Sequence, residues 1–110
     1  MNITVDVYES GTLTTVMVKG EIDAYTSSQL RDVIFPIINN ENINLEIDLA
    51  DVSYMDSTGL GVFVAAFKKV KANGGTFSLT GLSNRLERLF VITGLSDIMD
   101  IKGETKGEAE

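Results

Sequence analysis

The chain has 110 residues, a formal net charge of −7, and neither cysteine nor histidine, which predicts one domain with a single hydrophobic core. The missing residue types exclude disulfides and the common structural zinc sites, and the acidity argues against binding to nucleic acid, which needs a basic surface. No apolar stretch is long enough to span a membrane and no secretory signal is evident, so we expect a cytoplasmic protein without a membrane segment.

The first third of the chain predicts a β-hairpin followed by a helix. Residues 3–7 alternate between apolar and polar side chains, and residues 13–18 are again rich in β-branched residues. Thr26 and Gln29 have the spacing of a capping box, so we expect a helix to begin there. Pro36 should kink or end this helix, because it lacks the backbone donor. The apolar residues expected on the buried face are Leu30, Val33, Ile34 and Ile37.

The middle of the chain predicts a strand and then a long helix. Residues 43–49 alternate so regularly that one face of this strand should be only partly covered. From Thr58 the apolar residues recur every three or four positions, and the glycine pair at 74–75 should end the helix. The residues expected on its buried face are Leu60, Val64, Phe67 and Val70.

The last part of the chain predicts a strand over residues 76–80 and a helix between Ser83, as its N-cap, and Gly94, as its stop signal. A short strand over 98–101 should follow. The side chains expected on the buried face of the helix are Leu86, Leu89, Phe90 and Ile92.

The element order β-β-α-β-α-β-α-β predicts an α/β fold with a mainly parallel, mixed sheet and helices packed against it. We expect one domain over residues 1–102 and a flexible acidic tail over 103–110. In such sheets functional residues follow the carboxyl ends of strands. Two loops meet that condition, at 20–26 and at 50–57.

The second of these loops carries two adjacent hydroxyl groups, Ser57 and Thr58, between an apolar strand and an apolar helix. One interpretation is structural, with Ser57 as the N-cap of the helix at about 1 kcal/mol, although Asp56 would cap it equally well. A catalytic serine fails because the chain has no histidine base and has methionine where a nucleophile elbow needs glycine. Lys68 and Lys69 lie roughly 17 Å further along the helix, too far to serve as base.

Two other site classes are also disfavoured. A phosphate-binding loop would need a Gly-Lys-Ser/Thr sequence, which is absent. Asp48, Asp51 and Asp56 could supply carboxylates to Mg²⁺, but a phosphoaspartate receiver would need an acidic pair after its first strand, where only Glu9 stands. We therefore predict no catalytic residue, no metal site and no cofactor.

Phosphorylation is the simplest chemistry for an exposed serine that has no base. A seryl phosphate adds nearly two negative charges and three acceptor oxygens. At a helix N-terminus it meets unpaired N–H groups and the positive end of the helix dipole, so the domain need not unfold. On physical grounds alone the capping role of Ser57 stays the stronger interpretation, and phosphorylation of Ser57 is the simplest functional alternative.

The segment 51–63, with MDSTGLG at its centre, resembles the phosphorylation motif of the anti-sigma factor antagonists of the STAS domain family. Three further segments also resemble this family and occur in the family's order along the chain, at 20–25, 82–90 and 92–98. The resemblance is strongest to the branch that acts on the general stress sigma factor of Gram-positive bacteria.

The resemblance implies a partner-switching protein. In this family the unphosphorylated antagonist binds an anti-sigma factor, which is also a serine kinase, and so frees the sigma factor. The kinase phosphorylates the residue that matches Ser57, and a serine phosphatase of the metal-dependent type restores binding. Asp23 matches an acidic loop residue that faces the partner, with capping of the next helix as its alternative role. The predicted partner-binding residues are Asp23, Asp56, Ser57, Thr58, Gly59 and Gly61.

Two rival functions stay open. One is a small-ligand or nucleotide binder that uses the same loops, because STAS-like domains also occur attached to anion transporters. The other is an Asp-based Mg²⁺ enzyme or receiver, which would be labelled by an acyl phosphate donor.

Overall fold

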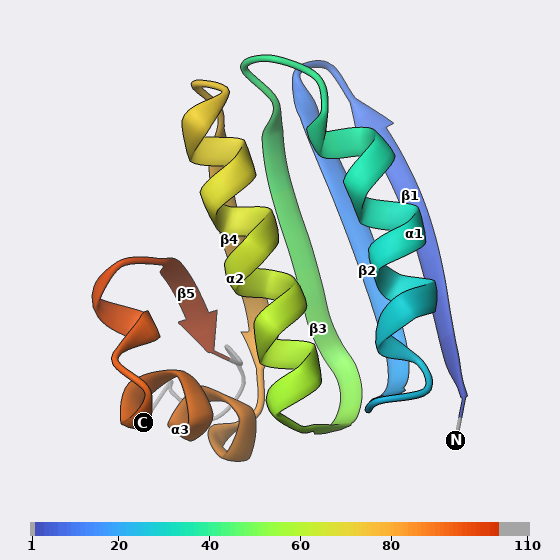
Figure 1. Ribbon diagram of the computed structural model, residues 1–110, viewed down its shortest axis with the longest axis vertical. Coiled ribbons are helices and arrows are strands. Elements are labelled where there is room, and N and C mark those ends of the chain that lie inside the picture. Colours follow the sequence, from blue (N-terminus) through green and yellow to red (C-terminus); the bar gives the residue numbers. More distant parts are fainter. Residues whose placement is uncertain (1, 104–110) are drawn as a thin grey trace.

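The computed structural model describes residues 2–103 as one five-stranded sheet with three helices (Figure 1). The strands are β1 (Ile3–Ser10), β2 (Leu13–Ile22), β3 (Asn44–Met55), β4 (Thr76–Leu82) and β5 (Asp100–Gly103). The helices are α1 (Ser27–Ile38), α2 (Ser57–Ala72) and α3 (Asn84–Ile92), with a 3₁₀ turn η1 (Leu95–Asp97) before β5. The predicted fold class and element order are confirmed.

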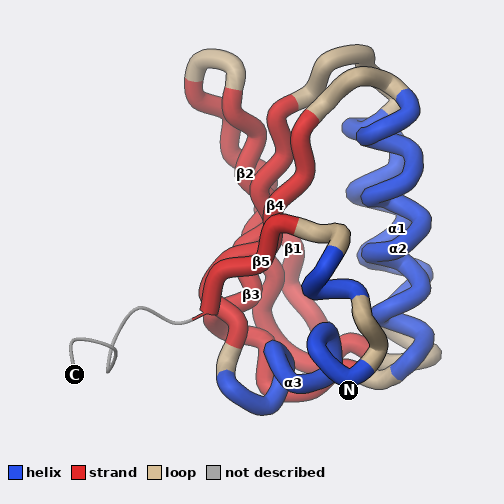
Figure 2. The backbone as a smooth tube through the Cα atoms, turned by 90° about the vertical axis from the view of Figure 1, so that its left-hand side faces the viewer, coloured by secondary structure: helices blue, strands red, loops and turns tan. Residues whose placement is uncertain are grey.

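Within residues 2–103, the two long helices cover one face of the sheet and leave the other open. The strands lie in the order β1-β2-β3-β4-β5, with β1 antiparallel to β2 and all other neighbours parallel. Helices α1 and α2 lie side by side over one face, and α3 lies beside the end at which β4 terminates (Figure 2). The opposite face of β3 carries half-buried polar side chains such as Glu46 and Asp48. The expectation that one face of this strand is only partly covered is therefore correct.

The core lies between the sheet and the two long helices. Its fully buried side chains come from every layer and include Val16, Val18, Ile47, Leu49, Leu79, Leu30, Ile34, Phe63, Val70 and Phe90. Removing an aliphatic or phenyl side chain of this size from water contributes about 1.5–3 kcal/mol each. The core therefore fixes where α1 and α2 begin relative to the strand ends.

Strands β2 and β3 both run further than the alternation pattern predicts, to Ile22 and Met55. The register between them shifts twice, and each shift leaves one extra residue on β3. Each extra residue turns the next side chain back toward the core, so that burial recurs every third position at Leu49, Val52 and Met55. This is why period-two alternation stops at residue 49 although the strand does not, and why the loop predicted at 50–57 is mostly strand.

Helix α1 begins where the sequence predicts, with Thr26 at the N-cap position, but it extends further at its C-terminal end. It continues past Pro36 to Ile38, and the carbonyl that loses its donor belongs to Asp32 on the exposed side, where water can bond it. The buried apolar residues are Leu30, Ile34 and Ile38, while Val33 and Ile37 are only half-buried. The fully buried side chains of α1 therefore recur every four residues.

The buried residues of helix α2 differ from the predicted ones. Its buried residues are Gly59, Val62, Phe63, Ala66 and Val70, so of the four predicted residues only Val70 is fully buried. The helix packs against both the sheet and α1, and the small residues Gly59 and Ala66 allow close approach. Phe67 is half-buried and meets Phe77 edge-on, with ring centroids 5.8 Å apart.

The C-terminal elements bring two corrections. Ile92 is 72% exposed, because it lies in the last turn of α3 beyond the part that meets the sheet, so its predicted burial is wrong. The last strand starts at Asp100 rather than at residue 98, because the turn that begins with η1 continues through Ile98 and Met99, whose N–H groups bond the carbonyl of Leu95. Gly103 is part of β5 and pairs with Leu82, and the rest of the predicted tail lies outside the described residues.

Candidate functional site

The candidate site lies where β2 and β3 end side by side. Ile22 and Met55, the last residues of the two strands, are partners in the parallel register. The next backbone N–H, that of Asp56, donates to the carbonyl of Ile22 over 3.2 Å. The two loops that sequence analysis singled out therefore meet at one point of the sheet edge, as expected for the carboxyl ends of parallel strands.

Asp56, and not Ser57, is the N-cap of α2. Its backbone is extended, and its carboxylate accepts hydrogen bonds from the N–H groups of Thr58, at 3.0 Å, and Gly59, at 3.4 Å. A carboxylate at this position also complements the helix dipole. The capping interpretation of Ser57 is thereby corrected.

The two neighbouring hydroxyl groups differ in their environment. Thr58 donates its hydroxyl hydrogen to the carboxylate of Asp56. Ser57 is the first residue of the helix and is exposed, and its hydroxyl has no partner among the hydrogen bonds of residues 2–103. Of the pair, Ser57 therefore offers the free hydroxyl.

The other loop at the site is organised by Asp23 and Thr26. The buried carboxylate of Asp23 accepts from the N–H groups of Tyr25 and Thr26, both at 2.9 Å. The hydroxyl of Thr26 accepts from the N–H of Asp23 at 2.9 Å and donates to the carbonyl of Glu21 at 2.7 Å. Because this hydroxyl is already engaged, it makes no cap bond to α1, and the predicted capping box is wrong.

The same hydrogen bonds hold the pKa of the Asp23 carboxyl below its usual value. The N–H of Thr26 is the main cause; burial works in the opposite direction, and the N–H of Tyr25 and the Thr26 hydroxyl lower the pKa further. Because the pKa of Asp23 is lower in the folded than in the unfolded protein, its ionised carboxylate stabilises the fold at pH values above the unfolded-state pKa, near 3.8. This stabilisation is lost as the pH falls through the folded-state pKa.

We expect Asp23→Asn to be less stable than the unmodified protein at pH 7, with a difference that shrinks as the pH falls below about 4. The physical reason is that below the folded pKa both proteins carry a neutral group at this position. Urea unfolding at pH 7 and pH 3 measures the difference. Asp32→Asn, which removes the same charge from an exposed side of α1, controls for net charge, and a gap of constant size at both pH values would contradict the prediction.

The two glycines at the start of α2 stand in different environments. A Cβ atom added to the buried Gly59 would lie 2.7 Å from Cγ2 of Ile22 and 2.8 Å from Cγ of Met55. A Cβ atom added to the exposed Gly61 would have no heavy atom within 4 Å. Gly59 therefore lets the helix pack onto the strand ends, whereas Gly61 leaves a flat stretch of surface.

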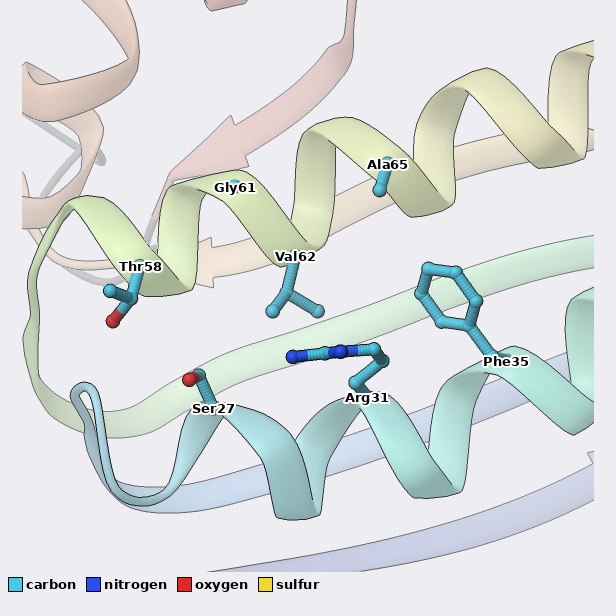
Figure 3. A pocket seen from close by; sticks show the side chains of 7 residues that line it. All are labelled: Ser27, Arg31, Phe35, Thr58, Gly61, Val62 and Ala65. Atoms are coloured by element: carbon cyan, nitrogen blue, oxygen red, sulfur yellow. The ribbon is translucent and has the colours of Figure 1, made fainter.

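A groove of about 490 Å³ runs between α1 and α2 from this end of the molecule (Figure 3). It is lined by Ser27, Arg31 and Phe35 of α1 and by Thr58, Gly61, Val62 and Ala65 of α2. Arg31 is the one charged lining residue, and its side chain lies between the helices. Sequence analysis did not single out Arg31 or Phe35. These two residues and Ser27 are spaced four apart, which indicates that they share one face of the helix.

The acidic trio considered as a metal site does not form one. Within residues 2–103, no group of three or more potential ligands is arranged to hold a metal ion. Asp48 instead accepts a hydrogen bond from the N–H of Ala50, at 2.9 Å. In the same described part of the chain, no helix has the length and apolar character needed to cross a bilayer.

Comparison with known proteins agrees with the resemblance. The family model of the STAS domain matches residues 4–108. The chain is 51% identical over 107 residues to the anti-sigma-B factor antagonist of Bacillus subtilis strain 168, covering 97% of each chain. It is 50% identical over 111 residues to the protein of the same name from Listeria monocytogenes, again covering 97% of each. A crystal structure of an anti-sigma factor antagonist from Mycobacterium paratuberculosis superposes with a TM-score of 0.85 at 27% identity, covering 94% of this chain and 88% of the other.

Proposed function

This chain belongs to the STAS domain family, and on that premise we propose that it is an anti-sigma factor antagonist of the general stress branch, switched off by phosphorylation of Ser57. Its unphosphorylated form binds an anti-sigma factor that is also a serine kinase, and so releases the sigma factor. A metal-dependent serine phosphatase restores binding. The role is one of binding in the cytoplasm, without catalysis, cofactor, nucleic acid or membrane. The relatives' names support the antagonist role.

The observation that carries the phosphorylation step is the contrast between the two hydroxyl groups. Ser57 is exposed at the first position of α2, whereas the hydroxyl of Thr58 is held by the Asp56 carboxylate. A kinase can reach the Ser57 oxygen without breaking a hydrogen bond described in this structure. Transfer forms a new O–P bond between the Ser57 oxygen and the γ-phosphorus of the ATP held by the kinase. The bond from that phosphorus to the bridging oxygen breaks, ADP leaves, and the serine proton passes to a base of the kinase.

The position of Asp56 indicates how the phosphate acts. The N–H groups of Thr58 and Gly59 already bond this carboxylate, so a phosphate on Ser57 cannot use them without displacing it. The expectation that the phosphate meets unpaired N–H groups therefore fails for Thr58 and Gly59, and we place the phosphate facing outward, next to an existing negative charge on a chain of net charge −7. A docked partner meets nearly two added charges and the bulk of the group, which is enough to weaken a closely packed contact.

The remaining predicted partner-binding residues divide into two kinds. Thr58, Gly61 and Asp56 lie at or near the accessible end of α2, and we propose that they contact the partner directly. Asp23 and Gly59 are buried, so their contribution is to fix the shape of the loop and the position of the helix. This assigns to Asp23 the supporting role rather than the outward-facing one.

The test is mass spectrometry of the protein purified from its own host before and during stress. We expect a phosphate on Ser57 that decreases on stress, when the antagonist has to bind its partner. An unmodified Ser57 under both conditions would count against the proposal. Acid stability of the label separates a phosphoserine from the acyl phosphate of a receiver.

A further inference from the structure

Tyr25 is the most exposed large hydrophobic side chain of the described residues, with 88% of its surface accessible. It lies between the buried residues Asp23 and Thr26, in the loop that leads from β2 into α1. Isolated exposed apolar residues are common on protein surfaces. What distinguishes Tyr25 is how its backbone is held and where its loop lies.

The backbone on both sides of Tyr25 is fixed by hydrogen bonds. Its own N–H and the following N–H bond the Asp23 carboxylate, and the Thr26 hydroxyl ties the loop to the carbonyl of Glu21. A tyrosine has only two side-chain torsions, so little conformational freedom remains to be lost on binding. Large aromatic residues that are presented in this way supply a large share of the energy of protein interfaces.

The Tyr25 loop is continuous with the Ser57 site. The hydrogen bond from the Asp56 N–H to the Ile22 carbonyl joins the two loops directly. Ser27, two residues after Tyr25, lines the same groove as Thr58, next to Ser57. A protein that reaches over the start of α2 to Ser57 therefore covers the adjoining loop.

We propose that Tyr25 is the anchor residue of the surface that binds the kinase, and that it enters an apolar pocket on that partner. This inference rests on the proposed function and adds a residue that the phosphorylation motif does not contain. The ring supplies apolar contact area, and the phenol oxygen can bond at the pocket rim. Tyr25 binds the kinase and takes no part in transfer of the phosphoryl group.

The test compares Tyr25→Ala, Tyr25→Phe and Tyr8→Ala for binding to the anti-sigma factor kinase by calorimetry. We expect Tyr25→Ala to bind about 30-fold more weakly, which corresponds to roughly 2 kcal/mol, and Tyr25→Phe to keep most of the affinity. Tyr8 is 55% exposed on the open face of the sheet and pairs with Thr15, about 20 Å along β2 from Ile22, so Tyr8→Ala is the matched control and should bind normally.

Phosphorylation kinetics add a second readout. For Tyr25→Ala, the KM for the antagonist should rise while kcat stays close to that of the unmodified protein, since the side chain touches no reacting atom. Binding of Tyr25→Ala within threefold of the unmodified protein, in an assay where Ser57→Asp loses affinity, would overturn the anchor role and leave the proposed function standing. Failure of the unmodified protein to bind any such kinase would overturn both.

Discussion

Ser57→Asp is expected to weaken binding to the kinase roughly 30- to 150-fold, which corresponds to about 2–3 kcal/mol of interface energy. The carboxylate places a negative charge where the phosphate would stand, beside Asp56 and on an exposed position of α2. The fold should stay intact, with a change in unfolding free energy below about 1 kcal/mol, because an acidic residue in the first turn of a helix is favourable. Calorimetric titration and urea unfolding measure the two effects separately.

Two neighbouring substitutions control this experiment. Ser57→Ala removes the hydroxyl without adding charge, and should bind the partner permanently because it cannot be phosphorylated. Thr58→Val keeps the shape of its side chain and should still switch, since the acceptor oxygen belongs to Ser57. Tight binding by Ser57→Asp, or loss of phosphorylation in Thr58→Val with normal binding, would contradict the assignment.

Alanine substitutions at Gly59 and Gly61 are expected to change stability in opposite directions. Gly59→Ala should destabilise the domain by about 1–3 kcal/mol, because the new methyl group would meet the side chains of Ile22 and Met55 within 2.8 Å. Gly61→Ala should stabilise it by roughly 0.5–1 kcal/mol, because alanine loses less backbone entropy and meets no neighbour. Urea unfolding of each variant under the same conditions measures both changes in stability.

The pair also separates packing from recognition. With Gly61→Ala the fold is preserved, so any loss of partner binding reports on the flat surface at this position. With Gly59→Ala the helix start must shift relative to Ile22, and binding and stability should fall together. A stable Gly59→Ala variant with unchanged affinity would show that the side chains of Ile22 and Met55 yield easily and that the close packing is not needed.

The fold was predictable because apolar residues alternate along the strands and recur every three or four residues along the helices, so that each change of spacing marks a change of element. The end of β3 was not, since the extra residues at the two register shifts make burial recur in threes at Leu49, Val52 and Met55. Such shifts involve the pairing with β2, which a search for period-two alternation along β3 does not reveal. The same limitation explains the stripe of α2, whose buried side is set by contact with both the sheet and α1.

The candidate site divides in a similar way. Ser57 could be predicted as the phosphoacceptor from the resemblance of its surrounding motif, and the missing histidine argued against a catalytic serine. The capping role of Asp56 and the engagement of the Thr58 hydroxyl required coordinates, because either acidic or hydroxyl residues can cap a helix. At Thr26 the sequence predicted a capping bond that does not form. The spacing to Gln29 fits a capping box, but the Thr26 hydroxyl bonds the N–H of Asp23 and the carbonyl of Glu21 instead.

The bond that joins Asp56 to the end of β2 has a consequence for the timing of the proposed switch. The proposed acceptor, Ser57, directly follows Asp56, whose N–H is hydrogen-bonded to the last residue of β2. A phosphate placed there changes the surface at once, without a slow rearrangement of the domain. The response time of the cycle is then set by the enzymes that add and remove the phosphate and by partner dissociation.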